Sequence, residues 1–137
     1  MTDDKSETVA EGRSEPGSGG FVKPSMLLRI EAGFELALSL IFYLAIHANW
    51  LLFIILLLAP DLAILGYLRG VRVGTICYNL VHTFVGPFLL IAYAFLGGAS
   101  WLLPYALIWT SHIALDRMLG FGLKYPTGFR DTHLQNK

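Results

Sequence analysis

The chain has 137 residues, of which 55% are hydrophobic and 15% are charged, and its mean hydropathy is +0.58. This composition is too apolar for a soluble domain of this size and predicts membrane-spanning segments. Ten basic residues balance ten acidic ones, so there is no excess positive charge to bind nucleic acid, and we expect no nucleic-acid partner. Cys77 is the single cysteine, which excludes an internal disulfide, a zinc ribbon and a CxxC redox pair.

The first residues differ from the rest of the chain. The stretch MTDDKSETVAEGRSEPGSGG is polar, acidic and rich in Gly, Ser and Glu, and it lacks the basic start and apolar segment of a secretory signal. Such a stretch buries too little surface to offset its ordering entropy. We therefore predict a disordered acidic tail over residues 1–24, a membrane bundle over residues 25–120 and a cytoplasmic C-terminal segment over residues 121–137.

Four apolar stretches are candidates for membrane-spanning helices. A helix needs roughly 20 apolar residues to cross the hydrocarbon core, and residues 26–46, 50–68, 73–96 and 101–119 come near this length. The connections HAN, RGVR and GGAS are short, so consecutive helices should be antiparallel neighbours. The sequence therefore predicts an all-α fold, namely an integral membrane up-down four-helix bundle. The lipid bilayer is the partner that we expect for it.

Basic residues indicate how this bundle is oriented. They lie before or in the first stretch, between the second and third, and in or after the fourth: Lys5, Arg13, Lys23, Arg29, Arg69, Arg72, Arg117, Lys124, Arg130 and Lys137. The other two turns contain none. The positive-inside rule therefore places both termini in the cytoplasm, and Trp50 and Trp101 would anchor the outer interface.

Two of the stretches contain a proline. Pro60 removes a backbone donor, so the second helix should kink or break at Ala59-Pro60-Asp61, and Asp61 could cap the piece that follows. Gly86-Pro87 should bend the third helix in the same way. Breaks at membrane depth are tolerated where protein or a water-filled cavity covers the freed backbone groups, which favours a polar interior.

Polar residues recur in all four stretches at helical spacing. Glu31 and Glu35, Asn79 and His82, and His112 and Asp116 are pairs three or four residues apart, so each pair shares a helix face. At 1.5 Å per residue, these pairs and Asp61 fall roughly 5 to 14 Å from the cytoplasmic ends of their helices. We expect the four helices to direct these faces toward one centre.

Imidazoles and carboxylates at one centre predict a divalent-metal site, with zinc as the first expectation and iron or manganese as alternatives. We assign His82, His112 and Asp116 as ligands, and Asp61 as a fourth or outer ligand. Glu31 or Glu35 would act as general base for a metal-bound water. The function that follows is a metal-dependent hydrolase of a lipid-like substrate.

Two other interpretations use the same residues. The carboxylates could pair with Arg29 and Arg117, Asp116 could simply hydrogen-bond His112 or His82, and Asn79 could lock helices together. The cluster would then be structural, and the protein would be a structural or accessory subunit with a larger membrane partner. Chains of Asp, Glu and His also mark proton or ion relays in transporters. Four helices are few for a transporter unless the chain forms a homo-oligomer, and the sequence does not fix the oligomeric state.

The C-terminal stretch GFGLKYPTGFRDTHLQNK follows the fourth helix and contains turn-forming residues. One interpretation is a cytoplasmic lid in which Lys124 and Arg130 bind an anionic headgroup or phosphate. The other is a basic tail attracted to anionic lipid.

Three strings of this sequence closely resemble a family of small bacterial integral membrane proteins classed as a domain of unknown function: LLRIEAGFEL, APDLAILGYLRGVRVGTICYNLVHTFVGP and HIALDRMLGFGLKYPTGFRDTHL. The resemblance covers residues 26–134 and implies a multi-pass protein of the bacterial inner membrane, without supplying an activity. A looser similarity links His82 and the later His112-x-x-x-Asp116 to membrane-bound metal-dependent hydrolases, although their early Thr-His signature is missing here.

Overall fold

The computed structural model describes residues 23–124, and this part of the chain is helical without a β-strand. The predicted acidic tail up to residue 22, and Arg130 with most of the C-terminal segment, lie outside the described residues. The elements in order are α1 (Pro24–Ala45), α2 (Trp50–Leu57), η1 (Ala59–Arg69), α3 (Val71–Val81), α4 (Val85–Leu96), η2 (Ser100–Leu102) and α5 (Leu103–Leu119).

The predicted break in the second stretch is present at Pro60. Helix α2 ends at Leu57, and the 3₁₀ helix η1 starts at Ala59, because a proline cannot donate to the preceding turn and its ring clashes with that turn. The expectation that Asp61 caps the second piece is wrong. No side chain caps η1, and Asp61 directs its carboxylate toward His82 and His112 instead.

The third stretch also breaks, but earlier than the sequence predicted. Helix α3 ends at Val81 and α4 begins at Val85, so the bend lies at residues 82–84 and Pro87 sits in the first turn of α4. A first-turn position tolerates proline because its missing N–H has no helical partner there. The indole Nε1 of Trp109 donates to the carbonyl of Val81 at 2.7 Å and so satisfies one of the carbonyls that the break leaves free.

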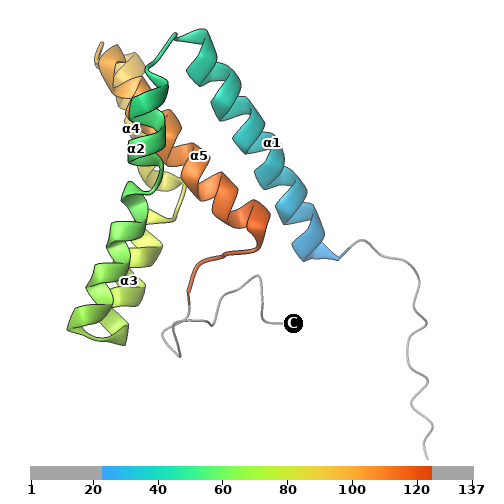
Figure 1. The fold of residues 1–137 in the computed structure, drawn as a ribbon, viewed down its shortest axis with the longest axis vertical. Coiled ribbons are helices and arrows are strands. Elements are labelled where there is room, and N and C mark those ends of the chain that lie inside the picture. The colour runs from blue at the N-terminus through green and yellow to red at the C-terminus, as the bar shows by residue number, and fades with distance from the viewer. Residues whose placement is uncertain (1–22, 125–137) are drawn as a thin grey trace, which may run out of the picture.

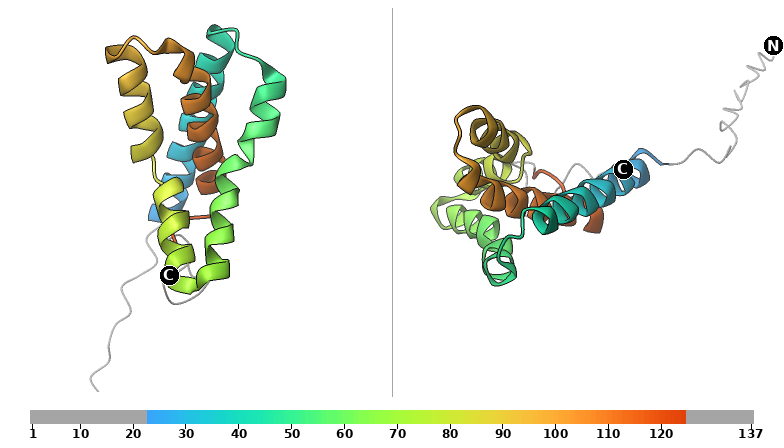
Figure 2. Two further views of the ribbon diagram at one scale, coloured as in Figure 1. Left: turned by 90° about the vertical axis from the view of Figure 1, so that its left-hand side faces the viewer. Right: turned by 90° about the horizontal axis from the view of Figure 1, so that it is seen from above.

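Helix α5 is the central element. Eight of its residues are buried, and α1, α2 and α4 all pack against it, as Figure 2 shows. Helix α1 lies beside α5, and the hydroxyls of Ser39 and Ser111 meet at 2.7 Å between them. A small apolar core of Tyr43, Phe53, Leu107 and Ile108 joins α1, α2 and α5.

The connections lie at two ends of the molecule. The loops after α1 and α4 share one end, and the turn between η1 and α3 lies at the other (Figure 1 and Figure 2). Trp50 follows the loop after α1, and Trp101 follows the loop after α4, so both lie at the same end. Arg69 and Arg72 flank the turn between η1 and α3 at the opposite end. These two tryptophans and these two arginines therefore lie at opposite ends of the described residues.

The exterior of the helices is unusually apolar. Two helical stretches are long and apolar enough to cross a membrane, Trp50–Arg69 and Val71–Leu96. Only 6% and 22% of their apolar windows are buried within the chain. Side chains such as Leu51, Ile54 and Leu89 are about two-thirds exposed, so these helices direct most of their apolar surface outward.

Glycine at position 74 lets η1 and α3 approach closely. A methyl group at Gly74 would overlap the ring of Tyr67, whereas one at Gly33 in α1 would meet only the sulfur of Met118 at an ordinary 3.8 Å. We expect Gly74→Ala to lower the stability of the fold by about 1–3 kcal/mol because the tyrosine must move. Gly33→Ala is the matched control and should be neutral or stabilising by up to ~1 kcal/mol. Thermal unfolding in detergent, followed by circular dichroism, compares the two; equal midpoints would contradict the close approach.

Candidate metal centre

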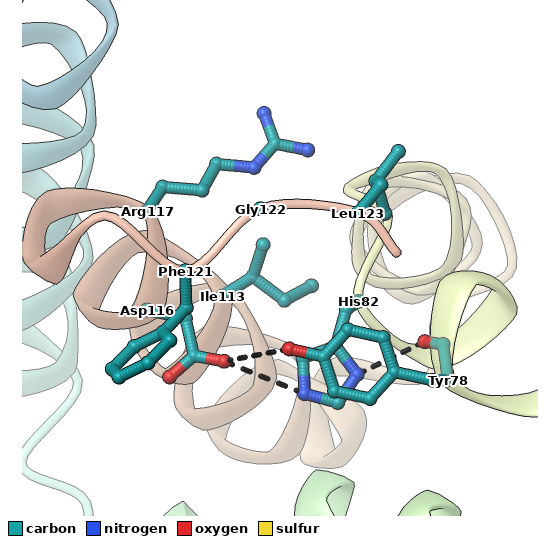
Figure 3. Close-up of a pocket in the computed structure, with 8 residues that line it drawn as sticks. All are labelled: Tyr78, His82, Ile113, Asp116, Arg117, Phe121, Gly122 and Leu123. Carbon is teal, nitrogen blue, oxygen red and sulfur yellow. Dashed lines mark hydrogen bonds and ion pairs between the residues drawn. The ribbon is translucent and has the colours of Figure 1, made fainter. Parts of the chain in front are cut away.

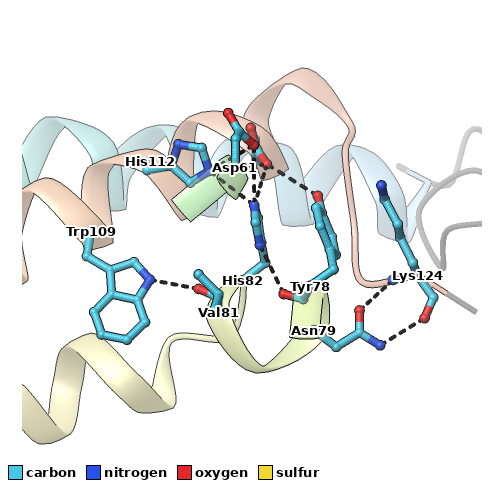
Figure 4. Close-up of polar contacts among 9 residues, drawn as sticks. Asp61, Tyr78, Asn79, Val81, His82, Trp109, His112 and Lys124 are labelled. Atoms are coloured by element: carbon cyan, nitrogen blue, oxygen red, sulfur yellow. Dashed lines mark hydrogen bonds and ion pairs between the residues drawn. The ribbon is translucent and has the colours of Figure 1, made fainter. Parts of the chain in front are cut away.

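Four metal-ligating side chains converge where the two helix breaks meet α5. Asp61 comes from the first turn of η1, His82 from the residue that ends α3, and His112 and Asp116 from successive turns of α5. One ligand atom from each lies within 4.8 Å of every other, as Figure 4 shows for the two imidazoles and Asp61. Both histidines are buried, whereas the side chains of Asp116 and Asp61 are 20% and 40% exposed.

The distances between these atoms fit a single metal ion. The Nε2 atoms of His82 and His112 are 3.1 Å apart. Asp61 Oδ1 lies 3.7 and 3.6 Å from these two nitrogens, and Asp116 Oδ2 lies 3.5 and 3.7 Å from them. Zinc bonds of about 2.0–2.1 Å place tetrahedral ligand atoms about 3.3–3.4 Å apart. The cluster is therefore close to the size of a tetrahedral zinc site.

The backbone selects the nitrogen of His82 that faces the cluster. Its Nδ1 lies 3.0 Å from the carbonyl oxygen of Tyr78, and because a carbonyl can only accept, Nδ1 carries the proton. The lone pair of Nε2 then points at His112, Asp61 and Asp116, as in histidines that bind metals. Without a cation between the two imidazoles, Nε2 of His112 must donate a hydrogen bond to Nε2 of His82. With a metal ion between them, the Nε2 lone pairs of both histidines would bind the ion.

Tyr78 supports both His82 and Asp116. Its ring stacks on the His82 imidazole with centroids 3.7 Å apart, and its hydroxyl donates to Asp116 Oδ2 at 3.4 Å. The ammonium of Lys124 lies 4.1 Å from the centroid of the Tyr78 ring. Burial lowers the pKa of Lys124, while the carboxylates of Asp116 and Asp61 oppose that shift. Tyr78 is thus enclosed between a cation and an imidazole, which fixes the direction of its hydroxyl.

The chain returns over the cluster after α5. We call residues 120–124 the strap. Gly120 has φ +95°, a left-handed conformation that ends helices and suits glycine. Further along, the side chain of Asn79 donates to the carbonyl of Lys124 at 2.9 Å and accepts from its N–H at 2.8 Å (Figure 4). The strap is therefore tied to α3 by two hydrogen bonds from one amide.

A small cavity separates the strap from the cluster. It has a volume of about 10 Å³, which is room for about one water molecule. The lining residues, drawn in Figure 3, are Tyr78, His82, Ile113, Asp116 and Arg117 together with Phe121, Gly122 and Leu123 of the strap. Two of the four candidate ligands thus border a space in which a water molecule fits.

Not every residue predicted for the site joins it. Glu31 is exposed, Glu35 is partly buried, and neither belongs to the group whose ligand atoms converge. Glu35 interacts electrostatically with Arg117 across α1 and α5. The expected centre is thus formed by η1, α3 and α5, without α1. A general-base role for either glutamate stays a prediction.

The structure describes only one of the two residues that we expected to bind an anion. Lys124 lies beside the cluster, against the rings of Tyr78 and Tyr67, whereas Arg130 falls outside the described residues. The guanidinium of Arg117 packs over the ring of Phe84 at 4.3 Å. Anion binding by Lys124 and Arg130 stays a prediction.

Tyr78 was not predicted as part of the site, and the segment that contains the strap was predicted only as a possible lid or as a basic tail. The signal for Tyr78 is its position four residues before His82, since i and i+4 share a helix face. Asn79 was expected to link helices within the polar layer, but its amide binds the strap instead. No spacing rule relates residue 79 to residue 124, so that contact depends on the tertiary fold.

We expect Asn79→Ala to release the strap, because both hydrogen bonds to Lys124 disappear and each contributes about 1 kcal/mol. Amide hydrogen exchange at residues 120–124, measured by mass spectrometry, should become roughly tenfold faster or more. Asn79→Asp keeps the acceptor for the Lys124 N–H and should give an intermediate rate. Exchange in α5 serves as the internal reference, and an unchanged strap in Asn79→Ala would show that other contacts hold it.

The sequence comparisons place this chain in a family without assigning it an activity. No curated protein and no solved structure matches it. The family model described as Domain of unknown function (DUF4260) matches residues 25–136. This confirms the resemblance that the sequence motifs indicated, and the matched range contains all four candidate ligands. The chain is a member of the DUF4260 family.

Proposed function

We propose that this protein binds one divalent metal ion, zinc in the first instance, through Asp61, His82, His112 and Asp116. The observation that carries the proposal is the set of five distances of 3.1–3.7 Å between the ligand atoms. The ligand atoms come from three separate helical segments and lie within these distances of one another. The unprotonated Nε2 of His82 already faces the other three ligand atoms. Isolated hydrogen-bonded pairs would not require all four groups to converge.

The choice of zinc follows from ligand type and geometry. Two imidazole nitrogens and two carboxylate oxygens suit zinc, iron and manganese. Adjacent ligand atoms lie about 3.4 Å apart around a tetrahedral ion and about 3.0 Å apart around an octahedral ion with similar bonds. Four of the five observed distances exceed about 3.4 Å and are therefore nearer to the tetrahedral spacing. Tetrahedral coordination is the preference of zinc.

We further propose that the chain forms an up-down four-helix bundle in the bacterial inner membrane with both termini in the cytoplasm. Helices that are apolar because they form the core of a soluble protein are mostly buried, whereas Trp50–Arg69 and Val71–Leu96 are mostly exposed. A lipid exterior would cover this surface, which water would not. Ionisable side chains inside such a bundle face its interior and mark functional sites.

Hydrolysis of a lipid-like substrate is the activity that we propose for this site. The specific observation in its favour is the cavity next to His82 and Asp116, because a hydrolytic zinc needs space for a water molecule beside its protein ligands. The metal would lower the pKa of that water to about 7 and supply hydroxide at neutral pH. A substrate in the surrounding bilayer would reach the site laterally.

Metal content tests the proposed site. We expect the purified protein, equilibrated with zinc and passed through a desalting column, to retain one zinc per chain by mass spectrometry of the metal. His82→Ala and His112→Ala should each weaken binding at least tenfold, because removing one ligand leaves three. His47→Asn is the matched control: His47 is exposed with a positive φ, which asparagine tolerates. Absence of zinc from the unaltered protein, or equal binding by all variants, would refute the site.

Cysteine labelling tests the orientation. In a Cys77→Ser background, Ser100→Cys places a thiol near the end that carries the tryptophans, and Arg72→Cys places one at the opposite end. We expect a membrane-impermeant maleimide to label the first variant in intact spheroplasts and the second only after permeabilisation. The reverse pattern would invert the proposed topology, and equal labelling of both would argue against a spanning bundle.

A further inference from the structure

The cavity between the strap and the cluster has a composition suited to a ligand of the metal. Its polar wall is formed by His82 and Asp116, which supply two of the four candidate ligand atoms, and by Tyr78, whose hydroxyl already donates to Asp116. The other lining residues are Ile113 and Arg117 from α5, and Phe121, Gly122 and Leu123 from the strap. The guanidinium of Arg117 packs over the ring of Phe84. An occupant of this space would lie beside two of the four candidate ligands and would otherwise meet mainly apolar atoms.

We propose that the metal has an exchangeable coordination position in this cavity, which takes one small oxygen or nitrogen donor such as water, hydroxide or a small anion. The inference rests on the proposed metal site and goes further, because four protein ligands alone would describe a closed structural site. Catalytic zinc keeps one coordination position for water or substrate and can become five-coordinate in the transition state. The volume of about 10 Å³ is room for about one water molecule.

Two features keep this position available. The strap is attached to α3 by the two hydrogen bonds between Asn79 and Lys124, and its residues 121 and 122 line the cavity. The ring of Tyr78 stacks on His82 and its hydroxyl donates to Asp116, and Tyr78 is one of the residues that line the cavity. The position therefore has both a shape and a polar partner.

Phe121 offers a way to alter this cavity without touching a ligand of the metal. Its side chain is 50% exposed, so its removal should cost the fold little. Phe88 in α4 is also 50% exposed and does not line the cavity. Phe121→Ala and Phe88→Ala are thus a matched pair that differ in their relation to the proposed position.

The test uses protein loaded with Co²⁺, whose visible absorption reports coordination number and geometry, and azide as the small anion. We expect azide to change the spectrum saturably with one site per metal. In Phe121→Ala, azide should bind at least fivefold faster because the wall is open, whereas Phe88→Ala should stay within twofold of the unaltered protein. Cobalt content and the azide-free spectrum should be the same in all three proteins.

The outcomes separate this inference from the metal site itself. If the unaltered protein binds no cobalt, the proposed metal site fails. If cobalt binds with a tetrahedral spectrum that azide does not change, the metal site stands and the exchangeable position is refuted. A response in Phe121→Ala alone would also refute it, because the native wall would then exclude ligands. Equal acceleration in Phe121→Ala and Phe88→Ala would place the azide site elsewhere.

Discussion

Two prolines constrain the arrangement on which the candidate site depends. Pro60 and Pro87 each lack the N–H that would continue a helix, and each lies shortly after the point where its apolar stretch is interrupted. The interruptions place Asp61 in a first turn and His82 at a helix end, where side chains can leave the apolar faces of their own helices. Uninterrupted helices of the same composition would carry these groups on regular faces at fixed spacing.

Helix α5 completes the site because it is the most buried element of the described chain. Its position among the other helices shields His112, which is 2% exposed, and the i, i+4 spacing puts Asp116 on the same face. Trp109 on this helix binds the free carbonyl of Val81, so α5 also stabilises the break that presents His82. Structural support and ligand supply therefore come from one helix.

Much of this arrangement is predictable from local chemistry. The remainder depends on which face each helix turns toward the site, and the sequence pattern does not determine that rotation. Hydropathy located the helices, proline located the first break, and the spacing of His112 and Asp116 gave one wall of the cluster. The exclusion of Glu31 and Glu35 was not predictable. Helix α1 buries Ala32, Ser39 and Tyr43, and the hydroxyl of Ser39 meets that of Ser111 in α5. Hydropathy does not reveal such close packing between small side chains.

The pairing of α1 with α5 has a consequence for assembly. These helices are the first and last of the described chain, and Arg29 of α1 packs against Gly120 at the end of α5. During synthesis, α1 exists for the whole time that the middle helices are made, yet its principal neighbour emerges last. Contacts between distant segments form late because a long loop must close first. The first of the described helices therefore remains without its principal partner until α5 has been made.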